Sequence, residues 1–200
     1  MEATSAPIFK NPLENVVAYI PTETSIYLGS PSLASLLNGG IIASHDFFGL
    51  KSYKNSFGRQ NMTRIHRSAD AGKSWRKLSD IKDLFWSSLF MHRGALYLLG
   101  CSAHYGNIFI RRSDDGARTW TGPLDEYSGL LFLGGKGYDP PNYHCAPVPV
   151  LDCQGRLWRA FEDNVTASWP DGFRALVISA LANSDLLKAS SLENDQQSFI

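Results

Sequence analysis

A tight turn that ends in tryptophan occurs twice in the chain, at residues 68–75 and again at residues 113–120. In the first copy, Asp70 can accept hydrogen bonds from backbone N–H groups a residue or two ahead, and Gly72 can supply the positive φ that such turns need. A strand-like run precedes each copy. A turn, a tryptophan and a strand that recur together predict a repeat of about 40–50 residues, the size of one four-stranded propeller blade.

The pattern S-x-D-x-G-x-S/T-W at residues 68–75 resembles the Asp box (BNR repeat) of the sialidase (neuraminidase) superfamily. The second copy matches less well, because its glycine falls one place early, at Gly116. Two ordinary Asp-Gly hairpins are the simpler interpretation, but the shared tryptophan and preceding strand favour a true repeat. Superfamily members are β-propellers, most often six-bladed, so the resemblance implies an all-β fold of four-stranded antiparallel blades. Asp boxes also occur in propellers that are not sialidases, so the motif indicates fold better than activity.

Strand-like runs and turns predict about three blades over residues 25–190, after an irregular lead-in at 1–24 and before a polar tail at 191–200. Propellers close with four to eight blades, so three would leave bare sheet edges and an apolar face. We therefore expect either a longer protein, of whose six-bladed propeller this is the N-terminal part, or self-association. In detail, we expect the second strand at 41–44 and the first strand of the third blade at 146–151.

The composition of the chain argues against several classes of binding partner. The chain has 19 Lys and Arg against 19 Asp and Glu, so its net charge of zero indicates no nucleic-acid partner. No apolar run approaches the ~18 residues of a membrane span, so we expect no membrane partner. Residues 1–10 lack the pattern of a signal peptide, and the cellular compartment stays open. The three cysteines, Cys101, Cys145 and Cys153, have no metal-like spacing, so we expect free thiols and neither metal nor cofactor.

The up-and-down order of strands predicts which loops meet. The two aspartate turns join third and fourth strands, whereas the loops between second and third strands, and the crossings between blades, lie on the opposite face. A pocket with titratable groups on that face is the natural candidate for a site. The residues expected there are Asp46, Tyr143, His144 and Glu162 as catalytic groups, and His45, His104, Tyr105 and Arg159 as substrate-binding groups.

The predicted roles follow from side-chain chemistry. Asp46, at the end of its strand, could act as a general acid if aromatic neighbours raise its pKa, with His45 orienting a hydroxyl group; the alternative is an aspartate that caps its own loop. Tyr143 and His144, held side by side after two prolines, could serve as nucleophile, proton donor or base.

The remaining candidates would bind the sugar. Tyr105 could stack on a sugar ring beside His104, although an exposed loop pair is an equal alternative. Arg159 matches a sugar carboxylate bidentately, although an ion pair with Glu162 is an equally ordinary arrangement.

The sialidase resemblance implies glycoside hydrolysis of an acidic glycan. In that superfamily a tyrosine nucleophile is activated by a glutamate, and three arginines grip the sialic acid carboxylate. Asp46 could fill the place of the family's acid/base aspartate. When the family's Tyr/Phe-Arg-Ile-Pro motif is aligned on residues 31–33, however, Gly29 stands where the family has an arginine.

Two alternatives remain open. The combination of Tyr143, His144 and Arg159 resembles, more weakly, the residues of propeller polysaccharide lyases such as ulvan lyases. There an arginine neutralises a uronate carboxylate, and a histidine or tyrosine takes the C5 proton. The third hypothesis is a non-catalytic propeller that binds a glycan or a protein.

Overall fold

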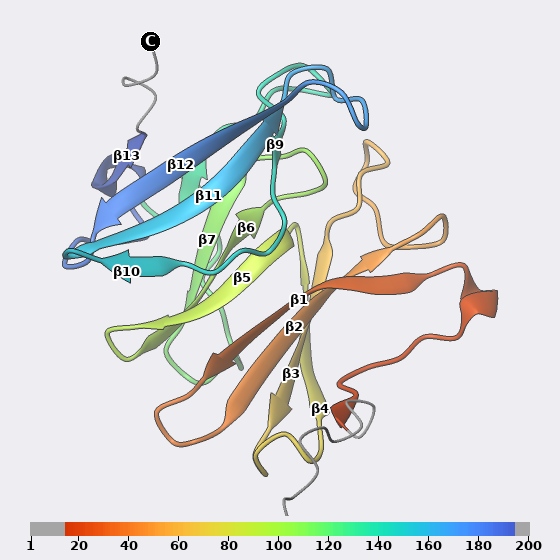
Figure 1. Ribbon diagram of the computed structural model, residues 1–200, viewed down its shortest axis with the longest axis vertical. Helices are drawn as coiled ribbons and strands as arrows, with labels where there is room; N and C mark the ends of the chain where they lie inside the picture. Colours follow the sequence, from red (N-terminus) through yellow and green to blue (C-terminus); the bar gives the residue numbers. More distant parts are fainter. Residues whose placement is uncertain (1–14, 195–200) are drawn as a thin grey trace, which may run out of the picture.

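The computed structural model describes residues 15–194, which form three antiparallel β-sheets (Figure 1). The first sheet contains β1 (Tyr27–Ser35), β2 (Ile41–Phe48), β3 (Met62–Ser68) and β4 (Arg76–Lys82). The second contains β5 (Phe85–His92), β6 (Ala95–Cys101), β7 (Ile108–Ser113) and β8 (Leu130–Phe132). The third contains β9 (Tyr143–His144), β10 (Leu151–Cys153), β11 (Arg156–Asn164), β12 (Phe173–Leu181) and β13 (Leu192–Asn194). Two 3-10 turns, η2 (Thr22–Thr24) and η3 (Ala189–Ser191), complete the elements.

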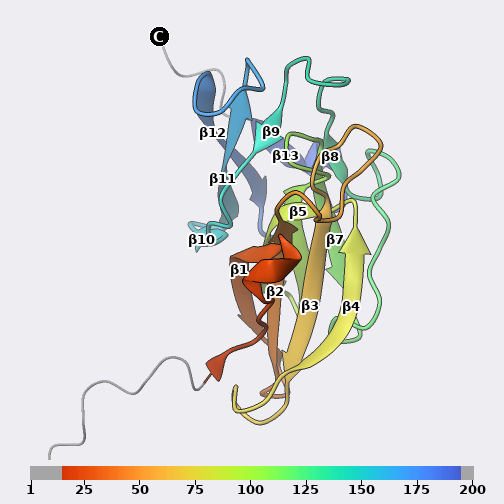
Figure 2. The same cartoon turned by 90° about the vertical axis from the view of Figure 1, so that its right-hand side faces the viewer.

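Within each sheet the strands follow one another in chain order and pair antiparallel. The expected all-β architecture of successive four-stranded antiparallel sheets is therefore confirmed. Figure 2 shows the four strands of the first sheet side by side, in order from β1 to β4. The three sheets lie face to face along the chain order and do not close into a ring within the described residues.

The β3–β4 turn is held by side-chain hydrogen bonds of the kind that the sequence suggests. Asp70 accepts from the backbone N–H of Ser74 at 2.9 Å and from its hydroxyl group at 2.5 Å, so the donors lie four residues ahead rather than one or two. Ser68 Oγ accepts from the N–H of Gly72 at 2.8 Å, and Gly72 has a φ of 87°. The Ser74 hydroxyl, with further bonds from Ser68 and the backbone, lowers the pKa of Asp70 to about 2.

The turn after β7 reaches the same geometry without a glycine at the expected place. Asp115 accepts from the N–H of Thr119 at 3.0 Å, and the N–H of Ala117 donates to Ser113 Oγ at 2.9 Å. Ala117 adopts a φ of 70° and is fully buried. Here a buried methyl group packs where the first turn has a glycine.

Several strands are longer than the sequence indicates. β2 runs to Phe48 and pairs with β3 through His45 and Asp46, so these two residues lie inside a strand and not at its end. β11 runs to Asn164 and pairs with β12 over its whole length, which places Glu162 in a strand rather than in a loop. Leu192–Asn194, at the start of the expected polar tail, pairs with β12 as the fourth strand. Most of that tail and of the expected lead-in lies outside the described residues.

The first strand of the third sheet is interrupted, which corrects the expected strand at 146–151. β9 and β10 both pair with β11, but the segment between them does not. Pro147 and Pro149 alternate in this segment and lack the backbone N–H that a ladder needs. His144 is consequently the last paired residue before the interruption.

Two apolar layers hold the sheets together. Burying each large apolar side chain contributes roughly 1.5–3 kcal/mol, so these layers supply most of the stability. Between the first and second sheets lie Ile42, Ile65, Ile81, Leu84, Leu89, Leu96, Leu98 and Ala117. Between the second and third sheets lie Ala95, Tyr97, Leu99, Cys101, Ile108, Ile110, Leu131, Cys145, Leu157, Phe161, Ile178, Ala180 and Leu186.

Candidate functional site

The strand registers place the candidate residues at the end of the sheets away from the aspartate turns. In the first sheet, Ile41 pairs with Ser68 beside the turn, whereas Asp46 pairs with Thr63 toward the other end. An isolated bridge joins Gly106, in the β6–β7 loop, to Tyr143 of β9. The expectation that the Asp70 turn lies on the face opposite His45 and Tyr143 is therefore confirmed, because His45 precedes Asp46 and pairs with Arg64.

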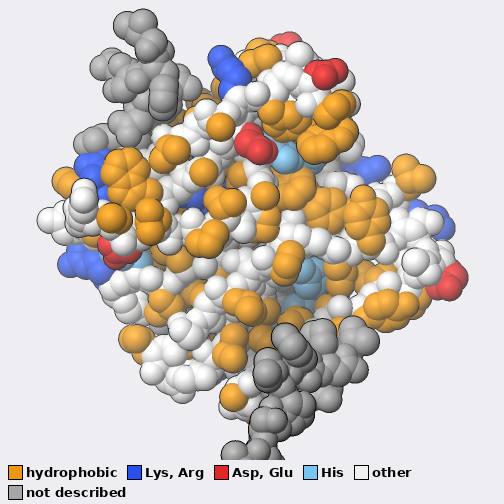
Figure 3. Space-filling model, in the orientation of Figure 1, with side chains coloured by type: hydrophobic (Ala, Val, Ile, Leu, Met, Phe, Trp, Pro, Cys, Tyr) orange, Lys and Arg blue, Asp and Glu red, His pale blue; other side chains and the backbone are white. Residues whose placement is uncertain are grey.

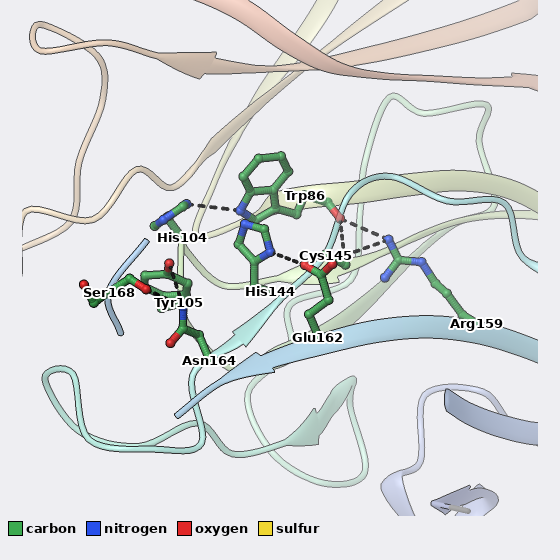
Figure 4. Close-up of polar contacts among 9 residues, drawn as sticks. All are labelled: Trp86, His104, Tyr105, His144, Cys145, Arg159, Glu162, Asn164 and Ser168. Carbon is green, nitrogen blue, oxygen red and sulfur yellow. Dashed lines mark hydrogen bonds and ion pairs between the residues drawn. The ribbon is translucent and has the colours of Figure 1, made fainter. Parts of the chain in front are cut away.

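The centre of the candidate site is a bonded histidine and glutamate. His144 and Glu162 are cross-strand partners on β9 and β11, and His144 Nδ1 lies 2.6 Å from Glu162 Oε2 (Figure 4). The side chain of His144 is 7% exposed and that of Glu162 is 42% exposed. Burial lowers the pKa of His144, while Glu162 opposes that shift. With Nδ1–H donated to Glu162, a neutral His144 carries its lone pair on Nε2.

Aromatic rings surround this pair. The His144 ring lies 4.5 Å from the Trp86 ring and 5.2 Å from the His104 ring, measured between centroids. Tyr105 and Phe173 lie 5.6 Å and 5.3 Å away. Figure 3 shows, over β9 and β11, an acidic side chain beside a histidine with apolar side chains on both sides. The arrangement combines a titratable pair with flat apolar surface.

Trp86 and His104 are joined directly. The indole Nε1–H of Trp86 donates to His104 Nδ1 at 3.3 Å, so the proton of neutral His104 is on Nε2 (Figure 4). Burial, together with the nearby His144 and Arg59, lowers the pKa of His104 to about 4. His104 is therefore neutral at physiological pH and can act as a hydrogen-bond donor through Nε2.

Tyr105 is fixed by contacts from all three sheets. Its ring lies 4.2 Å from that of His104, and Asn164 Nδ2 donates to its hydroxyl oxygen at 3.2 Å. Arg59, from the β2–β3 loop, donates to the Tyr105 carbonyl group and stacks 4.5 Å above the Tyr138 ring. The phenol oxygen of Tyr105 is the acceptor in the bond with Asn164. Tyr105 is 3% exposed, so it is not the exposed loop residue of the alternative interpretation, and burial raises its pKa.

Asp46 is buried behind this surface. It is 1% exposed, its Oδ1 lies 2.5 Å from Thr63 Oγ1, and its Oδ2 accepts from the backbone N–H of Trp86 at 2.8 Å. Burial raises the pKa of Asp46 to about 8. The direction of this shift is the one expected, but both carboxyl oxygens already have protein partners.

Arg159 is also buried, at 2% exposure, and lies between the second and third sheets. Its Nη2 donates to the Trp86 carbonyl oxygen at 3.0 Å and to Cys145 Sγ at 3.2 Å (Figure 4). The same nitrogen lies 3.2 Å from Ser88 Oγ. Its guanidinium lies 4.2 Å above the Phe161 ring. The structure thus places Arg159 against the back of Trp86, without an ion pair to Glu162.

Tyr143 and His45 lie apart from the His144–Glu162 pair. Successive residues of a strand point to opposite faces, so Tyr143 and His144 are not side by side as expected, and the Tyr143 ring instead faces Phe132 at 6.2 Å. His45 Nε2 lies 3.2 Å from His66 Nε2 in the first sheet. Of the eight candidate residues, the structure brings together His104, Tyr105, His144 and Glu162.

Trp86 was not expected in this cluster, and Asn164 and Arg59 were expected on this face of the molecule without a role in the site. The sequence predicts a strand over residues 85–90, and a tryptophan inside a strand is ordinarily a packing residue. No sequence pattern predicts that the Trp86 backbone has a positive φ of 56°. Asn164 ends β11 and is fully buried, so only its hydrogen bonds reveal its position.

Among residues 15–194, no three His, Cys, Asp or Glu side chains gather in a way that could hold a metal ion. The three cysteines are unpaired, with Cys101 and Cys145 buried and Cys153 exposed. No helix in the same range is long and apolar enough to span a membrane.

Comparison with known proteins identifies the fold alone. No protein-family model matches the chain, and no curated protein sequence matches it. Among solved structures, it resembles an α-L-arabinanase of Penicillium chrysogenum (19% identity, TM-score 0.56), covering 82% of this chain and 48% of that one. It also resembles the GH93 α-L-arabinofuranosidase of Fusarium graminearum (16% identity, TM-score 0.57), covering 88% of this chain and 50% of that one. A Trypanosoma rangeli sialidase is similar as well (14% identity, TM-score 0.51), with 82% of this chain and 24% of that one covered. The chain spans about half the length of the first two.

Proposed function

We propose that this chain carries the glycan site of a propeller-type glycoside hydrolase, centred on the His144–Glu162 pair. The observation that supports this most strongly is the half-exposed Glu162 carboxylate bonded to a buried histidine among aromatic rings. Aromatic rings bind the apolar faces of sugars, and a titratable pair can move the proton that glycoside cleavage requires. The three sheets would then be three consecutive blades, completed by blades outside this chain or by a second copy.

The proposed roles follow from the hydrogen bonds. Glu162 orients His144 through Nδ1, which leaves Nε2 as a proton acceptor for a water molecule or a hydroxyl group. Tyr105, rather than Tyr143, is the tyrosine beside this pair. A tyrosine nucleophile is an accepted exception to the two-carboxylate rule of glycosidases. Tyr105 is therefore the candidate for that role here.

We favour a neutral glycan over the acidic one that the sialidase resemblance implied. Arg159, the arginine expected to bind a carboxylate, is buried behind Trp86. The lyase alternative needs Tyr143, His144 and Arg159 in one place, and these three side chains do not meet. Arabinose-containing glycans are the first substrates to test, because arabinanase and arabinofuranosidases are among the similar structures.

The test is hydrolysis of a panel of aryl α-L-arabinofuranosides, β-D-xylosides and sialosides, with binding to arabinan measured in parallel. We expect Glu162→Gln and His144→Gln each to lower kcat/KM at least ~100-fold. Glu126→Gln, an exposed carboxylate outside the cluster, is the matched control and should leave activity intact. Binding without product release would support the non-catalytic hypothesis, and an unsaturated, ultraviolet-absorbing product would support a lyase. If the protein neither binds arabinan nor cleaves any of these substrates, the proposal is overturned.

A further inference from the structure

Trp86 occupies an unusual backbone position. The pairing of β5 with β6 shifts register between Phe85 and Ser88, so Trp86 and Ser87 form a bulge, which we call the Trp86 bulge. Trp86 has a φ of 56°, a conformation that a bulky residue rarely adopts unless its surroundings impose it. Such positions are characteristic of functional sites. The contacts that hold this conformation therefore matter to the site.

Two buried ionisable side chains hold the Trp86 peptide groups from opposite sides. Asp46 of β2, in the first sheet, accepts from the Trp86 N–H at 2.8 Å. Arg159 of β11, in the third sheet, donates to the Trp86 carbonyl oxygen at 3.0 Å, and Cys145 Sγ lies 3.1 Å from the same oxygen. Asp46 and Arg159 are 1% and 2% exposed. The first and third sheets thus each supply one side chain that bonds the Trp86 backbone in the second sheet.

The indole ring of Trp86 contacts two histidines of the candidate site. Its Nε1–H donates to His104 Nδ1, and its ring centroid lies 4.5 Å from that of His144 (Figure 4). The Phe48 ring lies 5.3 Å away. Any rotation of the Trp86 backbone would therefore displace the ring against which His144 rests.

We propose that Asp46 and Arg159 are positioning residues that together hold the Trp86 bulge, and so place the indole ring as the sugar-stacking wall beside His144. The sugar-stacking part rests on the proposed function; the positioning part does not. Neither residue touches substrate in this arrangement. They act through the Trp86 backbone, which explains why two ionisable groups are buried at the junction of three sheets.

The hydrogen-bond pattern predicts which substitution at Asp46 is tolerated. Thr63 has one hydroxyl hydrogen, while its Oγ1 lies 2.5 Å from Asp46 Oδ1 and 3.0 Å from the Leu84 carbonyl oxygen. If Thr63 donates to Leu84, a protonated Asp46 must donate to Thr63. An asparagine amide can make the same two bonds, donating to Thr63 and accepting from the Trp86 N–H. Asp46→Asn should therefore preserve the clamp, whereas the similarly sized Asp46→Leu should abolish it.

The experiment follows the five tryptophan indole N–H signals by ¹H–¹⁵N NMR, with the Trp86 signal identified by its loss in Trp86→Phe. We expect Asp46→Leu and Arg159→Met to shift or broaden the Trp86 signal selectively, and Asp46→Asn to leave it in place. Asp163→Leu is the matched control, because Asp163 is another buried carboxylate, at 2% exposure, that bonds Asn142 and Arg174 instead. It should leave the Trp86 signal unmoved.

An unshifted Trp86 signal in folded Asp46→Leu and Arg159→Met would overturn the proposal, as would an equal shift in Asp163→Leu. Should Asp46→Leu fail to fold, Arg159→Met tests the clamp from the third sheet, and Asp46→Asn must still retain the signal.

Glycan affinity separates this inference from the proposed function. If Asp46 acts through Trp86, Asp46→Leu should weaken arabinan binding by about the same factor as Trp86→Ala, and the double variant should be no weaker than Trp86→Ala alone. Additive losses would contradict the mechanism. Absence of arabinan binding in the unmodified protein, together with a selective NMR shift, would refute the glycan function and leave the positioning role standing.

Discussion

At the scale of single residues, the environment of Asp46 decides its chemistry. The carboxyl group pairs with Thr63 and with the Trp86 N–H in a site that excludes water, and burial raises its pKa to about 8. A carboxyl group of this kind stays neutral at physiological pH. A neutral Asp46 is consistent with the 2.5 Å bond to Thr63, because either Asp46 Oδ1 or Thr63 Oγ1 must supply the hydrogen.

The raised pKa predicts a specific dependence of stability on pH. Because the folded pKa of Asp46 lies above its unfolded value of 3.8, the contribution of Asp46 is fully present below pH 4 and is lost progressively as pH rises to about 8. The pKa rises by about 4 units, from 3.8 to about 8, and at roughly 1.4 kcal/mol per pKa unit the loss is at most about 6 kcal/mol. Urea unfolding from pH 4 to pH 9 should show the wild type losing stability relative to Asp46→Asn over this range. Parallel curves for the two proteins would contradict the shift.

At the scale of elements, the Trp86 bulge depends on the strand beside it. Gly100 of β6 faces the bulge, and a Cβ there would lie 2.7 Å from Ser87 Cα and 2.8 Å from the Phe85 carbonyl oxygen. Both are backbone atoms, so they cannot move aside by a side-chain rotation. A glycine in β6 is therefore a condition for the bulge in β5.

Gly100→Ala should consequently destabilise the protein by about 1–3 kcal/mol, the range for overpacked interiors. It should also shift the Trp86 indole signal, because the clash falls on the bulge itself. Gly122→Ala is the control, since its nearest contact would be Leu124 at 3.9 Å, and it should change stability by less than about 0.5 kcal/mol. Chemical denaturation of both variants measures the difference. Equal stability of the two would show that β6 tolerates a side chain at this point.

At the scale of the whole molecule, some apolar side chains on the outer faces of the first and third sheets stay exposed in the described chain. Leu33 of β1 is 63% exposed, and Val177 and Leu181 of β12 are 41% and 50% exposed. On β12 these alternate with Ile178 and Ala180, which are buried against the second sheet. Large exposed apolar faces of this kind mark interfaces or cause aggregation.

We therefore expect the 200-residue chain on its own to bind a hydrophobic dye strongly or to associate. The paired substitution Leu33→Ser and Val177→Thr should lower dye fluorescence markedly, because it removes apolar surface from both outer faces. Leu50→Ser, at an exposed loop position that is 86% accessible, should have little effect. Dye fluorescence and sedimentation measure the outcome. A monodisperse, dye-silent monomer would show that the faces are covered.

The sequence by itself determined the repeating strands and turns, the antiparallel sheets and the end of the molecule where candidate side chains gather. These features follow from local chemistry: the Asp70 and Asp115 turns, strand alternation and up-and-down order. It also indicated His104, Tyr105, His144 and Glu162. It did not indicate that Tyr143 points away from His144, since that depends on which residues of β9 pair with β11.

Only the tertiary structure decided the roles of Asp46, Arg159 and Trp86. Asp46 was expected to act as a general acid and Arg159 to bind a sugar carboxylate, yet packing between sheets buries both against one tryptophan. Burial and register at the junction of three sheets depend on residues from 46 to 159 in sequence, so no local pattern can report them. The same packing turns Trp86 from an ordinary strand residue into the wall of the candidate site.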